Sequence, residues 1–146
     1  MKVYKMVSKF KRKYPKTIAF RLRKHAQVVE NILDDDEIVY YTFCGQRNDA
    51  HTMIFDSCVV ALTNKRIIVG EKRLLFGYYL LNISTKLFND LSISSDMIFG
   101  RIEIDTVKEK LFISNIDKRA LDEIETMIHK IVNNNNKLHE VEEKKN

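Results

Sequence analysis

The sequence predicts an α+β fold: two N-terminal helices, seven antiparallel strands that form a sandwich or a small barrel, and one C-terminal helix. Three observations support this prediction. Apolar residues recur at helical spacing through residues 2–33, seven short β-branched and aromatic runs lie between residues 38 and 115, and a narrow apolar stripe occupies residues 121–132. Short strands at hairpin-like spacing are typical of antiparallel sandwiches and small barrels.

The first element is an amphipathic helix over residues 2–14. Its apolar side chains lie three and four residues apart, which puts them on one face of a helix with lysines on the other. These apolar residues are Val3, Met6, Val7, Phe10 and Tyr14. Pro15 interrupts this helix, and Thr17 is the expected N-cap of a second helix over residues 18–33.

The strands follow from residue 38 onward. We predict strands over residues 38–44, 59–62, 66–70, 78–83, 86–94, 98–106 and 111–115. The second and third flank a polar break, and Asn64 is expected at the turn of this hairpin because Asn tolerates positive φ. In the sixth, the side chains expected to face inward are Ile98, Gly100, Ile102, Ile104 and Thr106. Residues 34–37 are expected to be a solvated break before the first strand.

The closing helix is predicted from its apolar stripe, and Asp117 is the expected cap. The stripe consists of Leu121, Ile124, Ile128 and Ile131. Asn133–Asn136 are expected to end the helix. These boundaries divide the chain into a basic helical arm (1–33), a domain (34–132) and a polar C-terminal tail (133–146).

The arm is strongly basic, although the net charge of the whole chain is only +5. Ten of its 25 Lys and Arg lie in residues 1–29 without any Asp or Glu, so the remaining residues hold 15 basic and 20 acidic side chains. We expect such an arm to favour anionic surfaces. The candidate contact residues are Lys2, Lys5, Lys9, Lys11, Arg12, Lys13 and Lys16.

Three interpretations of the arm stay open. The helix can lie on an anionic membrane with its apolar side chains in the interface, or its cations can contact nucleic acid phosphates. It can also pack its apolar stripe on the domain or on a neighbouring subunit. Nucleic acid is the least favoured partner, because no aromatic stacking platform or known reading motif accompanies the charges.

The sequence predicts no catalytic, cofactor-binding or metal-binding residues. Cys44, His51 and Cys58 are seven residues apart, which matches no common zinc pattern. We therefore expect two free core thiols in a cytoplasmic protein, with attachment to the inner membrane face as the alternative location. No apolar run approaches the roughly 20 residues of a spanning helix.

Four stretches of the sequence resemble a bacterial PH-like domain of the YokE-like type. They are DDDEIVYYTFCGQ, VVALTNKRIIVGEKRLLFG, IFGRIEIDT and FISNIDKRALDEIETMI, and the LTNKR hairpin is the most specific of them. The resemblance covers about residues 30–132. It implies a partly open barrel of two near-orthogonal sheets with a helix plugging one end. It also implies a binding or oligomerisation module without catalytic residues.

The expected function is therefore a non-catalytic PH-like binding or scaffold module that contacts a protein or peptide partner, or a second copy of itself. A peptide can add to a sheet edge or to the groove beside the closing helix. Candidate partner contacts are Met53, Ile54 and Phe55 in the loop after the first strand, and Val3, Met6, Val7 and Phe10 in the arm. The alternative is peripheral association with an anionic membrane through the arm. Phosphoinositide head groups are not expected, because the loop after the first strand carries only Arg47 against Asp49 and Asp56. Lys72 and Arg73 after the third strand add only two further charges.

Overall fold

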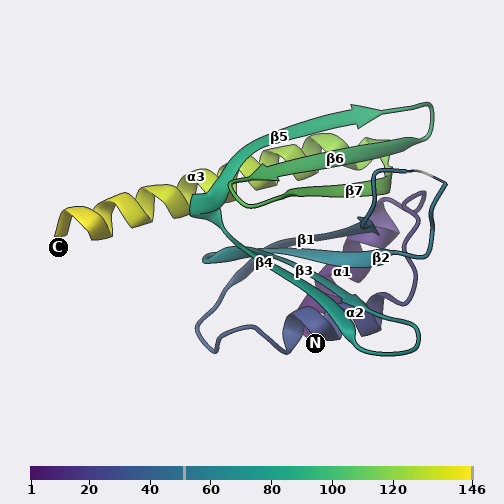
Figure 1. The fold of residues 1–146 in the computed structure, drawn as a ribbon, viewed down its shortest axis with the longest axis horizontal. Coiled ribbons are helices and arrows are strands. Elements are labelled where there is room, and N and C mark those ends of the chain that lie inside the picture. Colours follow the sequence, from purple (N-terminus) through teal and green to yellow (C-terminus); the bar gives the residue numbers. More distant parts are fainter. Residues whose placement is uncertain (51, 146) are drawn as a thin grey trace.

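A computed structural model describes residues 1–50 and 52–145 of the chain (Figure 1). The helices are α1 (Lys2–Lys13), α2 (Leu22–Glu30) and α3 (Leu121–Lys145), with short 3₁₀ turns at η1 (Thr85–Leu87) and η2 (Lys118–Ala120). The strands are β1 (Val39–Gln46), β2 (Ser57–Thr63), β3 (Arg66–Lys72), β4 (Tyr78–Ser84), β5 (Phe88–Ser95), β6 (Phe99–Thr106) and β7 (Lys110–Asp117). All seven predicted strands are confirmed in order, each within two residues of its predicted bounds.

The strands form a curled half-barrel. They are antiparallel, in the order β4-β3-β2-β1-β7-β6-β5. In the described residues β1 and β7 pair only at Gln46 and Ser114, so the β1–β4 and β5–β7 halves splay apart (Figure 1). In β6 the inward positions are buried as predicted from Gly100 to Thr106, whereas Ile98 precedes the strand and is exposed.

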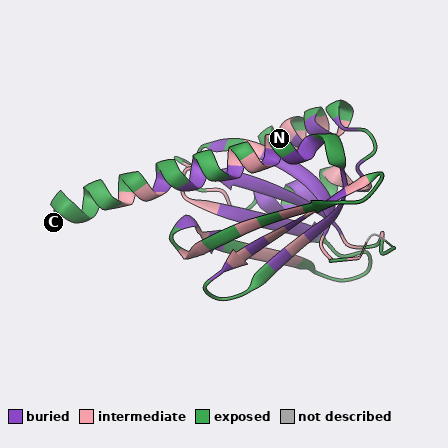
Figure 2. Ribbon diagram, turned by 90° about the horizontal axis from the view of Figure 1, so that it is seen from above, coloured by how far each residue is buried: buried purple, intermediate pink, exposed green. Residues whose placement is uncertain are grey.

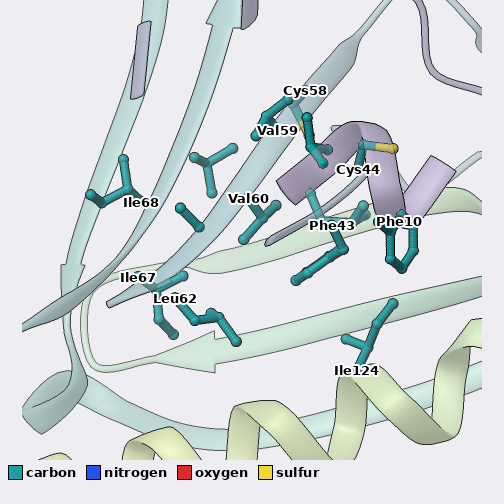
Figure 3. Packing of buried hydrophobic residues seen from close by; sticks show 14 of the residues in the cluster. Phe10, Phe43, Cys44, Cys58, Val59, Val60, Leu62, Ile67, Ile68 and Ile124 are labelled. Carbon is teal, nitrogen blue, oxygen red and sulfur yellow. The ribbon is translucent and has the colours of Figure 1, made fainter. Parts of the chain in front are cut away.

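The closing helix fills the opening of the half-barrel, as predicted. The four residues of its stripe, Leu121, Ile124, Ile128 and Ile131, are all buried. Figure 3 shows Ile124 beside Phe43 and Phe10, where the strands, α3 and α1 contribute to one core. Asp117 accepts a hydrogen bond from the backbone N–H of Arg119 (3.1 Å) and caps the η2 turn that leads into α3.

The predicted end of this helix at Asn133–Asn136 is wrong, because α3 continues to Lys145. Asn135 explains the continuation: it is buried, and its side-chain amide donates to the backbone carbonyl of Thr63 at the end of β2 (3.0 Å). The asparagine run therefore contacts the domain, and a helical extension replaces the expected tail. Beyond it the helix projects past the barrel with exposed side chains (Figure 2).

The N-terminal arm is an integral layer of the fold. α1 packs on β1 and α2 packs on β2 and β3, so the two helices cover the face of β1–β4 that points away from β5–β7 (Figure 1). Gly70 permits this approach, because a Cβ there would lie 2.7 Å from Val29 Cγ2. β2 is consequently buried along its whole length.

The second helix is shorter than predicted, and Thr17 does not cap it. α2 begins at Leu22, after Arg21 in a left-handed conformation. Thr17 is buried, and its hydroxyl accepts from the backbone N–H of Asp117 (2.9 Å). The connection also bonds the strands through Ile18, whose N–H donates to the Asn115 carbonyl (2.8 Å). These tertiary bonds hold it out of a helix.

The LTNKR hairpin is a structural clamp on the segment before β1. The Arg66 guanidinium bonds both carboxylate oxygens of Glu37, at 3.0 Å and 2.7 Å, and the Glu37 side chain is fully buried. Lys65 bridges Asp34 and Asp36. The expected solvated break at residues 34–37 is therefore wrong at Glu37.

Asn64 acts through its side chain, and its φ is not positive. Its Oδ1 accepts from the backbone N–H of Ile38 (2.9 Å), and its own N–H donates to the Ile38 carbonyl (3.0 Å). Asn64 therefore joins the hairpin turn to the start of β1, and the reason given for its place in the turn is wrong.

Candidate functional site

Large exposed apolar side chains gather at the end of the half-barrel that holds the β1–β2 and β3–β4 connections (Figure 1). Leu75 and Phe76 at the β3–β4 turn are both 85 % exposed, Leu74 is 70 % exposed, and Phe55 of the β1–β2 connection is 78 % exposed. We call this surface the apolar end, and it consists of Phe20, Met53, Ile54, Phe55, Leu74, Leu75 and Phe76. Clustered exposed apolar side chains in a globular domain are a candidate contact surface.

The β3–β4 turn is held rigidly at its base and projects at its tip. β3 and β4 pair without interruption from Arg66–Ser84 to Lys72–Tyr78. The Arg73 N–H donates to the Gly77 carbonyl (3.1 Å), and Gly77 adopts φ +72°, a left-handed conformation that favours glycine. The ladder therefore fixes a turn whose apolar tip cannot fold back on the core.

A shallow cavity of about 130 Å³ lies between the two connections. Its apolar wall comes from Phe20, Ile54, Phe55 and Leu74. Its volume is smaller than the several hundred Å³ typical of small-molecule sites. Because the exposed side chains stand around it, the apolar end suits contact with a surface better than enclosure of a ligand.

The rim of this cavity is cationic. Arg21, Lys72 and Arg73 line it, and the carboxylate among its lining residues is that of Glu71. Glu71 is buried and lies 3.0 Å from the Arg47 guanidinium. Burial raises the pKa of this carboxyl, and the Arg47 charge opposes that rise. The exposed charges that line the cavity are therefore positive, whereas the β1–β2 connection adds the carboxylates of Asp49 and Asp56.

His25 supports the base of the turn from α2. It is buried, and its Nδ1 accepts from the backbone N–H of Lys72 (2.8 Å). Burial, assisted by the Arg21 charge, lowers the pKa of His25 from 6.5 to about 4. The imidazole is consequently neutral near pH 7 and remains an acceptor there.

The predicted partner-contact residues fall into two groups. Met53 and Phe55 are exposed at the apolar end and Ile54 is partly buried there, so the structure places this triplet on a free surface. Val3, Val7 and Phe10 are buried under the chain's own sheet, and Met6 is partly buried against the core. In this structure the four arm residues cover the domain and are not a free contact surface.

The predicted anionic-surface residues lie on the outer side of α1 or just after it. Lys2, Lys5, Lys9, Arg12, Lys13 and Lys16 are exposed and Lys11 is partly exposed. Lys13 forms an ion pair with Glu123 of α3, and the Lys11 ammonium donates to the Pro15 carbonyl (2.9 Å). The remaining cations stay available to an anionic surface.

The sequence prediction missed Phe20, which lies in the predicted second helix. It also missed Leu74, Leu75 and Phe76, which lie in the connection between the predicted third and fourth strands. A usable signal was present: three consecutive large apolar residues between two strands, followed by Gly77, place apolar side chains in a turn. Such residues cannot reach a core through a tight hairpin, so they point to exposure.

The thiols and the metal hypothesis add no chemistry to this surface. Burial raises the pKa of Cys44 to about 12 and that of Cys58 well above its usual range, so both thiols are protonated near pH 7. Within residues 1–50 and 52–145 no three potential metal ligands lie close enough to hold an ion. His51 lies outside the described residues, so its grouping with the two cysteines stays untested.

Comparison with known proteins gives the class. The bacterial PH domain family model matches residues 33–130. The chain therefore belongs to the bacterial PH domain family, and α1 and α2 lie outside the matched stretch. A search among curated proteins finds no match. In the part of the chain that the structure describes, no helix has both the length and the apolar character to cross a membrane.

Two solved structures are similar to the chain. One is a DUF1696 family protein with a pleckstrin-homology domain from Shewanella loihica, with 16 % identity, a TM-score of 0.48, and coverage of 73 % of this chain and 92 % of that one. The other is a pleckstrin homology domain from Shewanella amazonensis, with 15 % identity, a TM-score of 0.49, and coverage of 77 % of this chain and 88 % of that one.

Proposed function

We propose that this chain is a non-catalytic binding module that docks on an anionic membrane surface through its apolar end. The observation that carries the proposal is the projecting tip Leu74-Leu75-Phe76, held by a rigid ladder with Lys72 and Arg73 at its base. If the tip enters the bilayer first, its apolar side chains reach the acyl chains while the cations at its base stay level with the anionic head groups.

The magnitudes favour reversible attachment. Full burial of a large apolar side chain contributes about 1.5–3 kcal/mol, and each Lys or Arg near an anionic leaflet adds about 1 kcal/mol. The three tip residues and the three rim cations together contribute more binding free energy than either group would contribute alone. Loss of translational freedom and partial immersion reduce the net binding energy.

The expected route through the arm is less favourable. Insertion of Val3, Val7 and Phe10 into a membrane requires α1 to leave the sheet, because these side chains are buried in the core. That step exposes β1 to water. The free energy lost when these side chains leave the core offsets the free energy gained when they enter the membrane. The exposed lysines of α1 can still add long-range attraction without detachment.

Vesicle co-sedimentation tests the proposal. The intact chain is mixed with phosphatidylcholine vesicles with or without phosphatidylserine, at low and high salt. We expect binding to the phosphatidylserine vesicles that salt weakens. The variant Leu75→Ser/Phe76→Ser should bind at least about tenfold more weakly, since loss of about 1.4 kcal/mol has that effect.

The matched control is Leu138→Ser/Val141→Ser, which removes two exposed apolar residues from the far end of α3 and should bind like wild type. Lys9→Gln/Arg12→Gln separates the route through α1. If that variant loses binding while the tip variant retains it, the membrane contact is the arm and the proposal for the apolar end fails. Absence of binding at low salt overturns the membrane function altogether.

Contact with a protein, the partner first expected from the sequence, is the second candidate. A specific observation favours it: β4 ends the sheet with an outer edge that no described strand covers. This edge is separate from the tip of the β3–β4 turn.

A further inference from the structure

The two strands that end the sheet, β4 and β5, differ in how their edges are protected. β5 has a register shift between Phe88 and Asp90 and carries the charge of Asp90. β4 pairs with β3 through seven consecutive residues without a shift, and its sequence YYLLNIS contains no charge and no proline. Natural edge strands are usually blunted by charges, bulges or proline, because an open edge is a template for another strand.

We propose that the outer edge of β4 pairs with β4 of a second copy of this chain. The pairing is antiparallel about a two-fold axis near Leu81, the middle residue of the strand. It joins the β1–β4 halves of the two copies into one continuous sheet. This contact goes beyond membrane docking and does not depend on it.

The side chains of β4 suit this pairing. Leu81 lies opposite Val69 and Ile83 opposite Ile67 in the β3–β4 ladder, so both share the face of β3 residues that are fully buried. Tyr79 shares that face. About the proposed axis Leu81 faces its own copy, and Tyr79 faces the partner's Ile83. Apolar and aromatic cross-strand pairs are favourable, and no like charges meet.

A second copy fits better than an unrelated strand, because an uncharged, regular strand is complementary to itself under two-fold symmetry. One pair of seven-residue strands is a small interface, below the roughly 1,200 Å² of stable complexes, so the dimer should be concentration-dependent. Antiparallel pairing sends the two apolar ends in opposite directions along the shared strands. Dimer formation and membrane docking can therefore be measured separately.

Charge exchange at Asn82 tests the proposal, because this side chain is exposed and lies next to the axis. Sedimentation velocity over a concentration series should show a monomer–dimer equilibrium for wild type. Asn82→Lys and Asn82→Glu alone should each be monomeric, since each charge then faces the partner's Leu80 and the two like charges lie on a diagonal about 7–8 Å apart across the axis. A mixture of the two variants should restore a dimer.

Asn89→Lys is the matched control, because Asn89 is an exposed asparagine on β5, the other edge strand. It should dimerise like wild type. A monomeric wild type at every concentration, or a dimer that both Asn82 variants retain, overturns the proposal. A dimer that Leu75→Ser/Phe76→Ser abolishes shows that the copies meet at the apolar end, and this also overturns it. The first two outcomes leave the membrane result unaffected, whereas a dimer formed through the apolar end would also compete with membrane docking.

Discussion

The buried ion pair between Arg66 and Glu37 gives a quantitative prediction for the clamp. The variant Arg66→Met keeps an apolar stem and removes the guanidinium. It leaves the fully buried carboxylate of Glu37 without its cation and the Ile32 carbonyl without its 2.7 Å donor. Removal of one partner of a buried pair typically costs about 3–5 kcal/mol, because the other charge stays desolvated. We expect the free energy of unfolding to fall by that amount near neutral pH.

The pKa of Glu37 supplies an independent magnitude. Burial alone would raise it, but the hydrogen bonds from Arg66 and Thr63 outweigh burial and lower the pKa from 4.5 to about 2. A depressed carboxyl pKa stabilises the fold above the unfolded value, and this contribution is lost as the pH falls from 4.5 toward 2. The difference corresponds to about 3 kcal/mol, which lies within the range expected for the substitution.

Urea unfolding near neutral pH and near pH 3 measures both effects. The double variant Glu37→Gln/Arg66→Met should be more stable than Arg66→Met, because the unpaired buried charge is gone. Lys65→Ala is the control, since its ion pairs with Asp34 and Asp36 are exposed, and its melting temperature should be nearly unchanged. An Arg66→Met protein within about 1 kcal/mol of wild type would refute the reasoning, because the clamp would then contribute no more than a surface pair.

Three further perturbations probe the packing. Ile124→Asp places a charge at a fully buried position of α3 and should abolish the cooperative thermal transition; a native melting curve would contradict the assignment of α3 as the closing helix. Gly70→Val should speed amide exchange in α2 and lower the melting temperature, because its Cβ would lie 2.7 Å from Val29 Cγ2, whereas unchanged exchange would show that the helix adapts. His25 has a pKa lowered to about 4, so the unfolded chain binds its proton first and stability should fall as the pH drops from 6.5 to 4. His25→Gln should flatten that part of the stability curve, and an unchanged slope would assign it to other groups.

Much of the fold is predictable because it depends on local periodicity. Alternation in the strands and three- and four-residue spacing in α1 and α3 are properties of short segments. The hairpin turn at residues 63–66 is equally local. These signals correctly placed seven strands, the closing helix and an N-terminal helix with one apolar face. They also placed Met53 and Phe55 in a loop, where the structure exposes both side chains.

The errors lie where a distant contact overrides a local preference. Thr17 has the chemistry of an N-cap, but its hydroxyl accepts from the backbone of Asp117, a hundred residues away. Asn135 has the chemistry of a helix end, but the Thr63 carbonyl takes its amide and the helix continues. Glu37 lies in an acidic run that suggests exposure to solvent, but its side chain is buried and forms an ion pair with the Arg66 guanidinium.

The amino-acid order by itself determined which segments are strands, which are helices, and which face of each is apolar, since neighbouring side chains fix those choices. Only the tertiary structure decided what covers each face. It packed the apolar stripe of α1 on β1, left the tip at Leu75 without a neighbour, and left the outer edge of β4 open. Whether an apolar side chain belongs to the core or to a contact surface depends on which element from a distant part of the sequence packs against it. The pattern of hydrophobicity along the chain does not specify that element.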